Sequence, residues 1–544
     1  MKKYQLLLLS LLSGLLLALA WPLNGISYLI FFAFIPMLWV EEIIIQNPLK
    51  YGKFSFFFIV FIGFFVWNVL TTYWIWNSTE AGAVFAFLLN SLLMTMVFNF
   101  YHYSRRVVFR KNKAYFALVL YWIAFEYFHM DWDFSWPWLT LGNVFANNPK
   151  LIQWYEYTGA FGGTLWIFLI NIFFFEIFLS IKNKESFSFN LKNKFFKTSI
   201  ICVLVLVIPI VFSVITYNRY EEKGTEVEVV VVQPNVDPYT EQYITPPLEI
   251  LQQMLVLAET KTDSNVDFVL FPESALQENV WEEKFDFSQS VNVLRCFTKK
   301  FPKLAVISGI STQRLLKEDE PITPAAREFS DDKGRYYEHL NTALLVDHSG
   351  NIQRYHKSKL TPGVEKMPFK KIFKPIEKLA IDLGGTVGSL GVDIERKVFN
   401  CQNGVKLSPV ICYESIYGGF VSEFVKNGAE LIFIITNDGW WGNTAGHRQH
   451  FSYAALRAIE SRRDIARSAN TGISCFVNQR GDILNRTDYW EPAAIRQKLH
   501  TNSKLTFYVK YGDYIGKIAL YSGFILLLLS FIMGIKLINR NKMD

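Results

Sequence analysis

Paired cysteines are the first feature that this chain lacks. Its 544 residues include only five cysteines, at positions 202, 296, 401, 412 and 475. No two of them have CxxC spacing, and together they form no regular framework. Zinc sites and disulfide scaffolds depend on such spacings, so both are disfavoured. Cys202 lies in an apolar segment and is expected to be a small core residue.

A long basic stripe is also missing. The formal net charge is +7, but the basic residues cluster beside apolar runs instead of forming one continuous surface. Nucleic-acid binders carry the second kind of pattern. We therefore expect no nucleic-acid partner.

The overall composition lies between that of a soluble protein and that of a membrane-embedded one. Hydrophobic residues make up 51% of the chain and aromatic residues 17%, including 49 Phe, yet the mean hydropathy is only +0.18. Such an average indicates two populations of sequence. The length alone predicts at least two structural units.

Eight apolar stretches are long enough, or nearly long enough, to cross a bilayer. A hydrocarbon core about 30 Å thick requires roughly 20 helical residues. The stretch 114–129 is short and contains Glu126. The predicted spans are 4–21, 26–42, 54–76, 83–104, 114–129, 164–181, 198–217 and 515–538.

Lysine and arginine alternate along the connections between these spans. Lysines lie before the first span and after the second and sixth, and lysines and arginines together lie after the fourth span and in the C-terminal tail. The intervening connections are nearly free of them: 22–25 and 77–82 have none, and 130–163 has only Lys150. Positive connections stay in the cytoplasm. Both termini are therefore expected to be cytoplasmic, and the long segment 218–514 extracytoplasmic.

Two segments have alternative interpretations. Residues 1–20 also fit a cleaved signal peptide, with Lys2 and Lys3 before a Leu-rich stretch that ends in Ala18-Leu-Ala20. Cleavage would leave the side of the large segment unchanged. Segment 130–163 is rich in Trp and Tyr, which favours an interfacial aromatic belt over a specific lipid-binding role.

Segment 218–514 has the character of an α/β domain. Short β-branched runs alternate with helix-like segments at 248–261, 287–300 and 450–467. Turns at 348–351 and 478–481 predict antiparallel hairpins, whereas 316–340 and 485–503 are polar and read as loops. The predicted strands are 227–232, 268–271, 304–308, 343–346, 407–411 and 431–436. The result is a layered, mixed-sheet domain, flanked by membrane segments 1–217 and 515–544.

Three chemically useful side chains follow predicted strands. Cys412 comes directly after 407–411, Glu273 follows 268–271, and Lys357 lies in a basic segment, Tyr355-His-Lys-Ser-Lys-Leu360. A thiolate is a strong nucleophile, a carboxylate can act as its base, and an ammonium can stabilise an oxyanion. Strand ends meet at one edge of a sheet, so all three can converge there.

Each of the three residues also has a simpler explanation when it is taken alone. A cysteine after an apolar run is usually a buried small residue. Glu273, after Pro272, can cap a helix, and Lys357 can belong to a solvated basic face. Their ordered combination favours acyl transfer through a thioester.

The local contexts resemble the nitrilase, or carbon–nitrogen hydrolase, superfamily over about 225–485. The motifs are Phe271-Pro-Glu273, Tyr355-x-Lys357-x-x-Leu360 and Cys412-Tyr-Glu414. Together with the arrangement of spans, three further segments resemble its membrane-bound branch, the apolipoprotein N-acyltransferase family. These segments are Thr436-Asn-Asp-Gly-Trp-Trp-Gly442, Arg457-Ala-Ile-Glu-Ser-Arg-Arg463 and Asn470-Thr-Gly-Ile473.

The resemblance implies a role for several residues. Cys412 would be the acylated nucleophile, Glu273 the general base, and Lys357 the stabiliser of the tetrahedral intermediate. Glu365 matches a second essential carboxylate, which can be a charge partner of Lys357 or a proton acceptor from the incoming amine. The remaining matches are Tyr413 and Glu414 beside the nucleophile, and Trp440, with Trp441, near the lipid entrance.

Two departures from the family pattern stand out. The usual Pro-Phe-Gly-Glu is Pro362-Gly-Val-Glu365 here, which keeps the spacing and changes the loop. A Trp expected soon after the first strand is absent, and Tyr243 is a stand-in. Trp440 and Trp441 also fit ordinary interfacial anchors.

The resemblance further implies the fold, the reaction and its partners. The fold would be a membrane domain of about eight helices plus an extracytoplasmic αββα sandwich. The enzyme would move an acyl chain, through a Cys412 thioester, from a phospholipid, expected to be phosphatidylethanolamine, to the N-terminal cysteine of a diacylglyceryl-apolipoprotein. No cofactor or metal is expected, and the location would be the bacterial cytoplasmic (inner) membrane.

Two rival functions remain at the level of sequence. A membrane-tethered amidase or nitrilase would pass the acyl group to water. A transporter or receptor would need no catalysis, but the spans show no internal repeat, and their few ionisable residues, such as Glu126 and Glu176, form no clear pathway.

Overall fold

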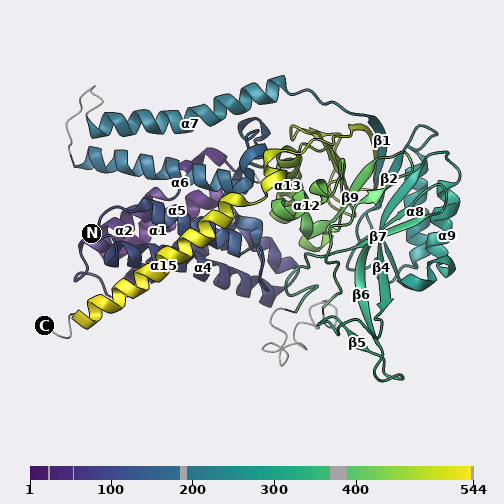
Figure 1. The fold of residues 1–544 in the computed structure, drawn as a ribbon, viewed down its shortest axis with the longest axis horizontal. Helices are drawn as coiled ribbons and strands as arrows, with labels where there is room; N and C mark the ends of the chain where they lie inside the picture. Colours follow the sequence, from purple (N-terminus) through teal and green to yellow (C-terminus); the bar gives the residue numbers. More distant parts are fainter. Residues whose placement is uncertain (23–24, 53, 184–192, 368–388, 541–544) are drawn as a thin grey trace. The chain divides into compact units, whose positions relative to one another are not determined.

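The computed structural model of the protein describes residues 1–22, 25–52, 54–183, 193–367 and 389–540. It divides into two compact units, residues 1–219 with 513–544, and residues 220–512. Figure 1 shows the helices of the first unit and the strands and helices of the second.

The first unit is a bundle of apolar helices. In the described part of the chain, seven helical segments are long and apolar enough to cross a membrane. The helices are α1 (Lys3–Ala20), α2 (Ile35–Gln46), α3 (Ser55–Thr72), α4 (Glu80–Val107), α5 (Tyr115–Phe128), α6 (Tyr155–Lys182), α7 (Lys194–Arg219) and α15 (Tyr514–Arg540). Short 3-10 turns are η1 (Ser27–Phe31), η2 (Tyr73–Asn77), η3 (Pro137–Leu139), η4 (Leu141–Phe145) and η5 (Pro149–Leu151).

Helix α5 differs from the predicted span at 114–129. It has 14 residues, and at about 1.5 Å per residue it is shorter than the hydrocarbon core, so the adjoining residues must complete the crossing that the predicted orientation requires. Glu126 near its end is buried and accepts hydrogen bonds from Trp122 Nε1, the Leu141 backbone and Thr164 Oγ1. These bonds tie the end of α5 to η4 and α6, so Glu126 has a structural explanation.

Helix α1 packs closely against α3. The Ser10 hydroxyl donates to the Ile59 carbonyl at 2.6 Å, and a Cβ on Gly14 would stand 2.3 Å from the Gly63 carbonyl oxygen. Only a glycine permits that approach. Cleavage after Ala20 would remove all of these contacts.

The second unit contains two β-sheets in the described residues. The larger sheet has the order β14-β1-β2-β4-β6-β5, with β3 beside β4 and β7 beside β6; the smaller has the order β13-β12-β11-β10-β9-β8. The strands of the larger sheet are β1 (Glu226–Gln233), β2 (Phe268–Leu270), β3 (Leu276–Trp281), β4 (Ala305–Leu315), β5 (Arg327–Glu328), β6 (Tyr336–Val346), β7 (Ile352–His356) and β14 (Ala493–His500). Those of the smaller are β8 (Phe399–Asn400), β9 (Lys406–Ile411), β10 (Leu431–Thr436), β11 (Ile465–Ala469), β12 (Cys475–Val477) and β13 (Ile483–Leu484).

Helices cover the outer faces of these sheets, so the unit has four layers. In Figure 1, α8 and α9 lie beside the larger sheet, and α12 and α13 lie beside the smaller one. The two sheets meet through β1, β2 and β11, where the rings of Phe268 and Phe433 pack edge to face. The helices are α8 (Pro247–Glu259), α9 (Gln289–Thr298), α12 (Gly418–Lys426), α13 (Ala445–Ser461) and α14 (Phe507–Tyr511), with η6 (Glu282–Phe287), η8 (Cys412–Ile416) and η9 (Asp438–Trp441). The predicted αββα architecture is confirmed.

Most predicted elements are present, and three are corrected. All six predicted strands form, and both predicted turns join antiparallel pairs, β6 with β7 and β12 with β13. The predicted helix 450–467 is wrong at its end, because α13 stops at Ser461 and residues 465–469 are strand β11. The predicted loops 316–340 and 485–503 contain β5, the start of β6, and β14, which pairs with β1 along its whole length.

Candidate active site

Cys412 stands at a sharp bend between β9 and η8. Strand β9 is a parallel neighbour of β10 in the smaller sheet, and its last residues are fully buried. The backbone then turns, and Cys412 adopts φ of +48°, a left-handed conformation that costs a residue with a side chain about 1–3 kcal/mol. The side chain is 9% exposed. A strained, nearly buried thiol of this kind needs surrounding contacts to hold it.

Glu273 lies just beyond β2 on a backbone that is also tightly constrained. The next residue, Ser274, has φ of +54°. Gly309 on β4 lies against this segment: an added Cβ would stand 2.5 Å from the Ser274 nitrogen and 2.6 Å from the Glu273 Cα. Both obstacles are backbone atoms, so residue 309 must be glycine for β4 to pass this closely.

Lys357 follows β7 and lies between two carboxylates. Its side chain is 2% exposed, and its Nζ is 2.9 Å from Glu273 Oε1 and 2.8 Å from Glu365 Oε1. The altered loop at 362–365 therefore still brings Glu365 to Lys357, with Gly363 at φ of +82°. The structure joins Glu273, Lys357 and Glu365 in one buried ionic group.

Asn341 completes this group and was not predicted. Its Nδ2 is 2.8 Å from Glu273 Oε1 and 3.2 Å from Glu365 Oε1. The second oxygen of Glu273 accepts the backbone N–H of Asn437 at 3.1 Å. Asn341 lies within β6, in no motif that marks it, so the sequence gives no signal for this contact.

Burial and nearby charges determine whether the Cys412 thiol is protonated. Burial raises the pKa of the Cys412 thiol, Glu273 raises it further, and Lys357 offsets only part of the effect. The thiol is therefore protonated at rest and requires a base. Burial lowers the pKa of Lys357, but Glu273 and Glu365 together raise it well above its usual value, so the ammonium is retained. Burial also opposes ionisation of Glu365, yet the charge of Lys357 lowers the pKa of Glu365 overall.

Glu414 joins the bend at Cys412 to the segment that carries Lys357. Its Oε1 accepts the Ser358 N–H at 2.6 Å and the Tyr355 hydroxyl at 2.7 Å, and its Oε2 accepts the Ile411 N–H at 2.8 Å. Burial raises the pKa of Glu414 to about 7, although these hydrogen bonds act in the opposite direction. Tyr355 was predicted only as part of a motif, and its partner was not foreseen.

The other predicted residues lie at different positions around the bend. Tyr413 is buried and packs edge to face on Tyr417, with ring centroids 5.3 Å apart. Trp440 contacts Tyr239 and Tyr243, with centroids at 5.1 and 6.4 Å. Trp441 instead packs on the ring of His450 at 5.7 Å. The two tryptophans therefore have different surroundings.

The rings of Tyr239, Tyr243 and the half-buried Trp440 pack together, and with Ile244, the neighbour of Tyr243 in sequence, they are named here the aromatic rim. Tyr243 is 65% exposed and Ile244 is 78% exposed. Partial burial of the Tyr243 hydroxyl, followed by the charges of Glu273 and Glu365, raises the pKa of that hydroxyl.

Two groups of side chains have the donor types of a metal site. Potential ligand atoms of Cys412, Asp438 and His450 lie within 4.8 Å of one another, as do those of Glu222, Asp464 and His500. In the first group, the guanidinium of Arg467 already binds Asp438 at 2.5 Å. A cation at that position opposes a metal ion, so the group is better described as a hydrogen-bond network.

Comparison with known proteins gives a consistent result over both units. Residues 13–173 match the family model described as the apolipoprotein N-acyltransferase N-terminal domain, and residues 229–499 match the carbon–nitrogen hydrolase model. An apolipoprotein N-acyltransferase of Chlorobaculum tepidum is 28% identical over 531 residues, which cover 94% of each chain. Another, of Geobacter metallireducens, is 27% identical and covers 93% of this chain and 91% of its own.

Proposed function

Because the chain belongs to the apolipoprotein N-acyltransferase family, in the carbon–nitrogen hydrolase superfamily, we propose that it transfers an acyl chain from a phospholipid to an apolipoprotein through Cys412. It is a membrane protein and an acyltransferase, and its reaction is the N-acylation of lipoproteins. What we propose is the identity of the acyl donor, the roles of the residues around Cys412 and the order of the two half-reactions. It rests on the arrangement around Cys412 described above.

In the first half-reaction, Glu273 removes the proton from the Cys412 thiol. The sulfur attacks the ester carbonyl of the phospholipid, and the Lys357 ammonium stabilises the tetrahedral oxyanion. When the C–O bond breaks, the departing alkoxide takes the proton from Glu273. A lysophospholipid leaves, and the acyl group remains on sulfur as a thioester.

In the second half-reaction, the free α-amine of the diacylglyceryl cysteine attacks the thioester. Glu273 accepts a proton from the amine and returns it to the Cys412 sulfur as the C–S bond breaks. The products are an amide and the original thiol. The distance of 2.8 Å between Glu365 and Lys357 supports the charge-partner role for Glu365, because the ammonium then stays fixed and charged throughout.

The donor is proposed to be the sn-1 acyl chain of phosphatidylethanolamine. The aromatic rim supports a lipid donor, since Tyr243 and Ile244 expose apolar surface beside charged catalytic groups. An acyl chain gains about 0.8 kcal/mol for each CH₂ that it buries. Trp440 and Tyr239 would contribute to the same contact, and Trp441 supports the bend from the side of His450.

The orientation is proposed from the charge pattern of the connections. Lys and Arg alternate along the chain so that both termini would be cytoplasmic and residues 218–514 extracytoplasmic in a bacterial cytoplasmic membrane. Both substrates carry lipid chains in that membrane. This placement would give the catalytic unit access to lipoproteins on the outer surface.

One observation carries the proposal: Lys357 is held by Glu273 and Glu365, and the charges of Glu273 and Lys357 act on the protonated thiol of Cys412. The test against a hydrolase follows the radiolabelled thioester with and without a diacylglyceryl peptide. Fast loss of label only with the peptide, as peptide amide, is the expected result. Equally fast loss to water without the peptide would contradict the acyltransferase mechanism.

A further inference from the structure

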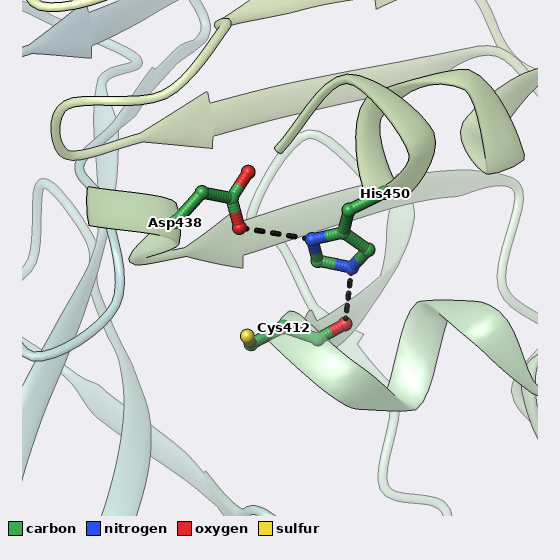
Figure 2. A group of neighbouring side chains, drawn as sticks. All are labelled: Cys412, Asp438 and His450. Carbon is green, nitrogen blue, oxygen red and sulfur yellow. Dashed lines mark hydrogen bonds and ion pairs between the residues drawn. The ribbon is translucent and has the colours of Figure 1, made fainter. Parts of the chain in front are cut away.

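The backbone carbonyl of Cys412 accepts hydrogen bonds from two buried side chains. The Ser415 hydroxyl donates to it at 2.7 Å, and His450 Nε2 lies 3.2 Å from the same oxygen. His450 Nε2 also lies 2.9 Å from the Ser415 Oγ, so the two side chains hold the Cys412 carbonyl together. Figure 2 shows the contact between Nε2 and the Cys412 oxygen on the carbonyl side of Cys412, with the sulfur directed away from it.

His450 is itself held by a second buried residue. Its Nδ1 lies 2.9 Å from Asp438 Oδ1, and Asp438 also binds Arg467 at 2.5 Å and the Thr436 hydroxyl at 2.7 Å. Burial opposes ionisation of Asp438, but the charges of Arg467 and His450 hold its pKa far below the usual value. Asp438 thus fixes the orientation of the His450 ring from the Nδ1 side.

This arrangement differs from a Cys–His–Asp catalytic triad. In a triad, one ring nitrogen accepts the proton of the nucleophile while the other donates to the carboxylate. Here Nδ1 faces Asp438, but Nε2 faces the Cys412 carbonyl and the Ser415 hydroxyl. Nε2 is therefore directed at the backbone of Cys412, on the side away from the sulfur (Figure 2).

The held carbonyl belongs to the same peptide group as the Tyr413 N–H. A peptide group is planar and nearly always trans, so its C=O and N–H point in opposite directions. Fixing the Cys412 oxygen with a hydroxyl and an imidazole therefore fixes the direction of the Tyr413 N–H. Two contacts to one oxygen restrain a residue whose φ of +48° is otherwise unfavourable.

We infer that Asp438 and His450 are positioning residues, which hold the Cys412–Tyr413 peptide plane so that the Tyr413 N–H donates to the oxyanion of each tetrahedral intermediate. The inference rests on the proposed role of Cys412 as nucleophile. His450 and Arg457, seven residues apart on α13, both bind carbonyl groups of η8, since Arg457 Nη1 donates to the Ile416 carbonyl at 2.5 Å. Helix α13 thus presents donors to the entire bend.

The test compares two reactions of the same thiol in the full-length protein. One is single-turnover acylation by phosphatidylethanolamine, followed by intact mass. The other is alkylation by iodoacetamide, which forms no oxyanion. In His450→Ala, we expect acylation to slow by about 10- to 100-fold, whereas alkylation should change by less than about 3-fold because it needs no oxyanion donor. His450→Gln keeps an N–H donor and should recover part of the acylation rate.

His447→Gln is the matched control, because His447 is a second buried histidine of α13 and stacks on Tyr489 instead of η8. Its two rates should equal those of the unaltered protein.

Equal rates of acylation in His450→Ala and the unaltered protein would overturn the inference, and so would an equal slowing of both reactions. If His450→Ala does not fold, Asp438→Asn takes its place, and the inference again requires that acylation slows while alkylation does not. No adduct on the unaltered protein would contradict the proposed function itself, and this inference with it.

Discussion

At the scale of single residues, the candidate site depends on charges that are removed from water together. Lys357, Glu273 and Glu365 are all buried or nearly so. Each charge would be costly alone, because removing an ion from water costs several kcal/mol. The ammonium offsets this cost for both carboxylates, and it remains available to a negative intermediate.

Replacing Lys357 by Met should therefore affect both stability and activity. We expect unfolding to become easier by about 3–5 kcal/mol, since two buried carboxylates lose their partner, and acylation of Cys412 to be abolished. Denaturant unfolding and intact mass measure the two effects. Lys300→Met is the control, because Lys300 and Glu259 form an exposed ion pair expected to contribute less than about 1 kcal/mol. Equal stability of the two variants would contradict the account.

Glu414→Gln tests the connection between the two segments of the site. Glutamine has one acceptor oxygen, so either the Ser358 and Tyr355 donors or the Ile411 N–H would face an NH₂ group. We expect a loss of about 1–3 kcal/mol in unfolding free energy and a fall in acylation rate of about 10²-fold from misplacement of Lys357 and Cys412. Glu423→Gln, on the exposed face of α12, should change neither quantity. Normal acylation in Glu414→Gln would refute this role.

The sequence was informative about those site residues that follow strands. Glu273, Lys357 and Cys412 have local contexts that can be read directly, and the spacing of Glu365 from Lys357 survives a changed loop. Asn341 and His450 lie in no quoted motif, and Asp438 lies in the motif Thr436–Gly442 without a contact that the motif would indicate. Asn341 and Glu273 are 68 residues apart in the chain, so their contact depends on which strands become neighbours in the sheet.

At the scale of elements, burial decided which strands could be predicted. Strands β9 and β10 are mostly apolar and almost wholly buried, and their predicted limits lie within one residue of the observed ones. Strand β11 contains Arg467, whose guanidinium is satisfied by Asp438 and by the Ile473 carbonyl. Its polar residues continue the composition of the preceding helix α13, so the predicted helix 450–467 extended past the observed end at Ser461. Strand β14 is polar because only one of its long edges pairs, with β1.

The start of β11 gives a pH-dependent prediction. Burial, together with nearby Glu222, raises the pKa of Asp464 to about 8, while Asp464 Oδ2 accepts the His500 N–H at 2.7 Å. The folded protein thus holds this proton more tightly than the unfolded chain does. Its contribution to stability is fully present below about pH 4 and is lost as the pH rises towards about 8.

Asp464→Asn remains uncharged at every pH, so it removes this dependence. Between pH 5 and 8, the unaltered protein should lose stability relative to Asp464→Asn by up to about 1.4 kcal/mol per pH unit. Unfolding midpoints at several pH values measure the difference. Asp332→Asn, at an exposed position, should instead follow the unaltered protein. Parallel profiles for Asp464→Asn and the unaltered protein would show that Asp464 is not protonated in the folded state.

At the scale of the whole molecule, the pattern of apolar runs predicted most of the long helices. The orientation of the chain in the membrane remains a proposal. Seven helical segments are long enough to cross a membrane in the described residues, and α5 falls short. Hydropathy does not give the length of α5, because the helix ends at the turn after Phe128 and at the hydrogen bonds of Glu126. Those bonds join residues that are up to 38 positions apart.

The orientation can be tested with a cysteine that the chain already has. Cys296 is exposed on α9 in the second unit, whereas the other four cysteines are buried. In intact spheroplasts of a Cys412→Ala variant, a membrane-impermeant maleimide should label Cys296. With Cys296 also replaced by Ala, a cysteine introduced at Lys111 should react only after the membrane is permeabilised. The reverse pattern would place the termini outside the cytoplasm and contradict the charge argument.

The most direct test of the account is the intact mass of the purified protein after exposure to phosphatidylethanolamine. We predict an added acyl mass that hydroxylamine removes, and that is absent from both Cys412→Ala and Glu273→Gln. Subsequent addition of a diacylglyceryl peptide should move the acyl group to the peptide amine. An acyl mass that persists in Cys412→Ala, or no acyl mass on the unaltered protein under conditions in which the peptide becomes N-acylated, would contradict the thioester mechanism.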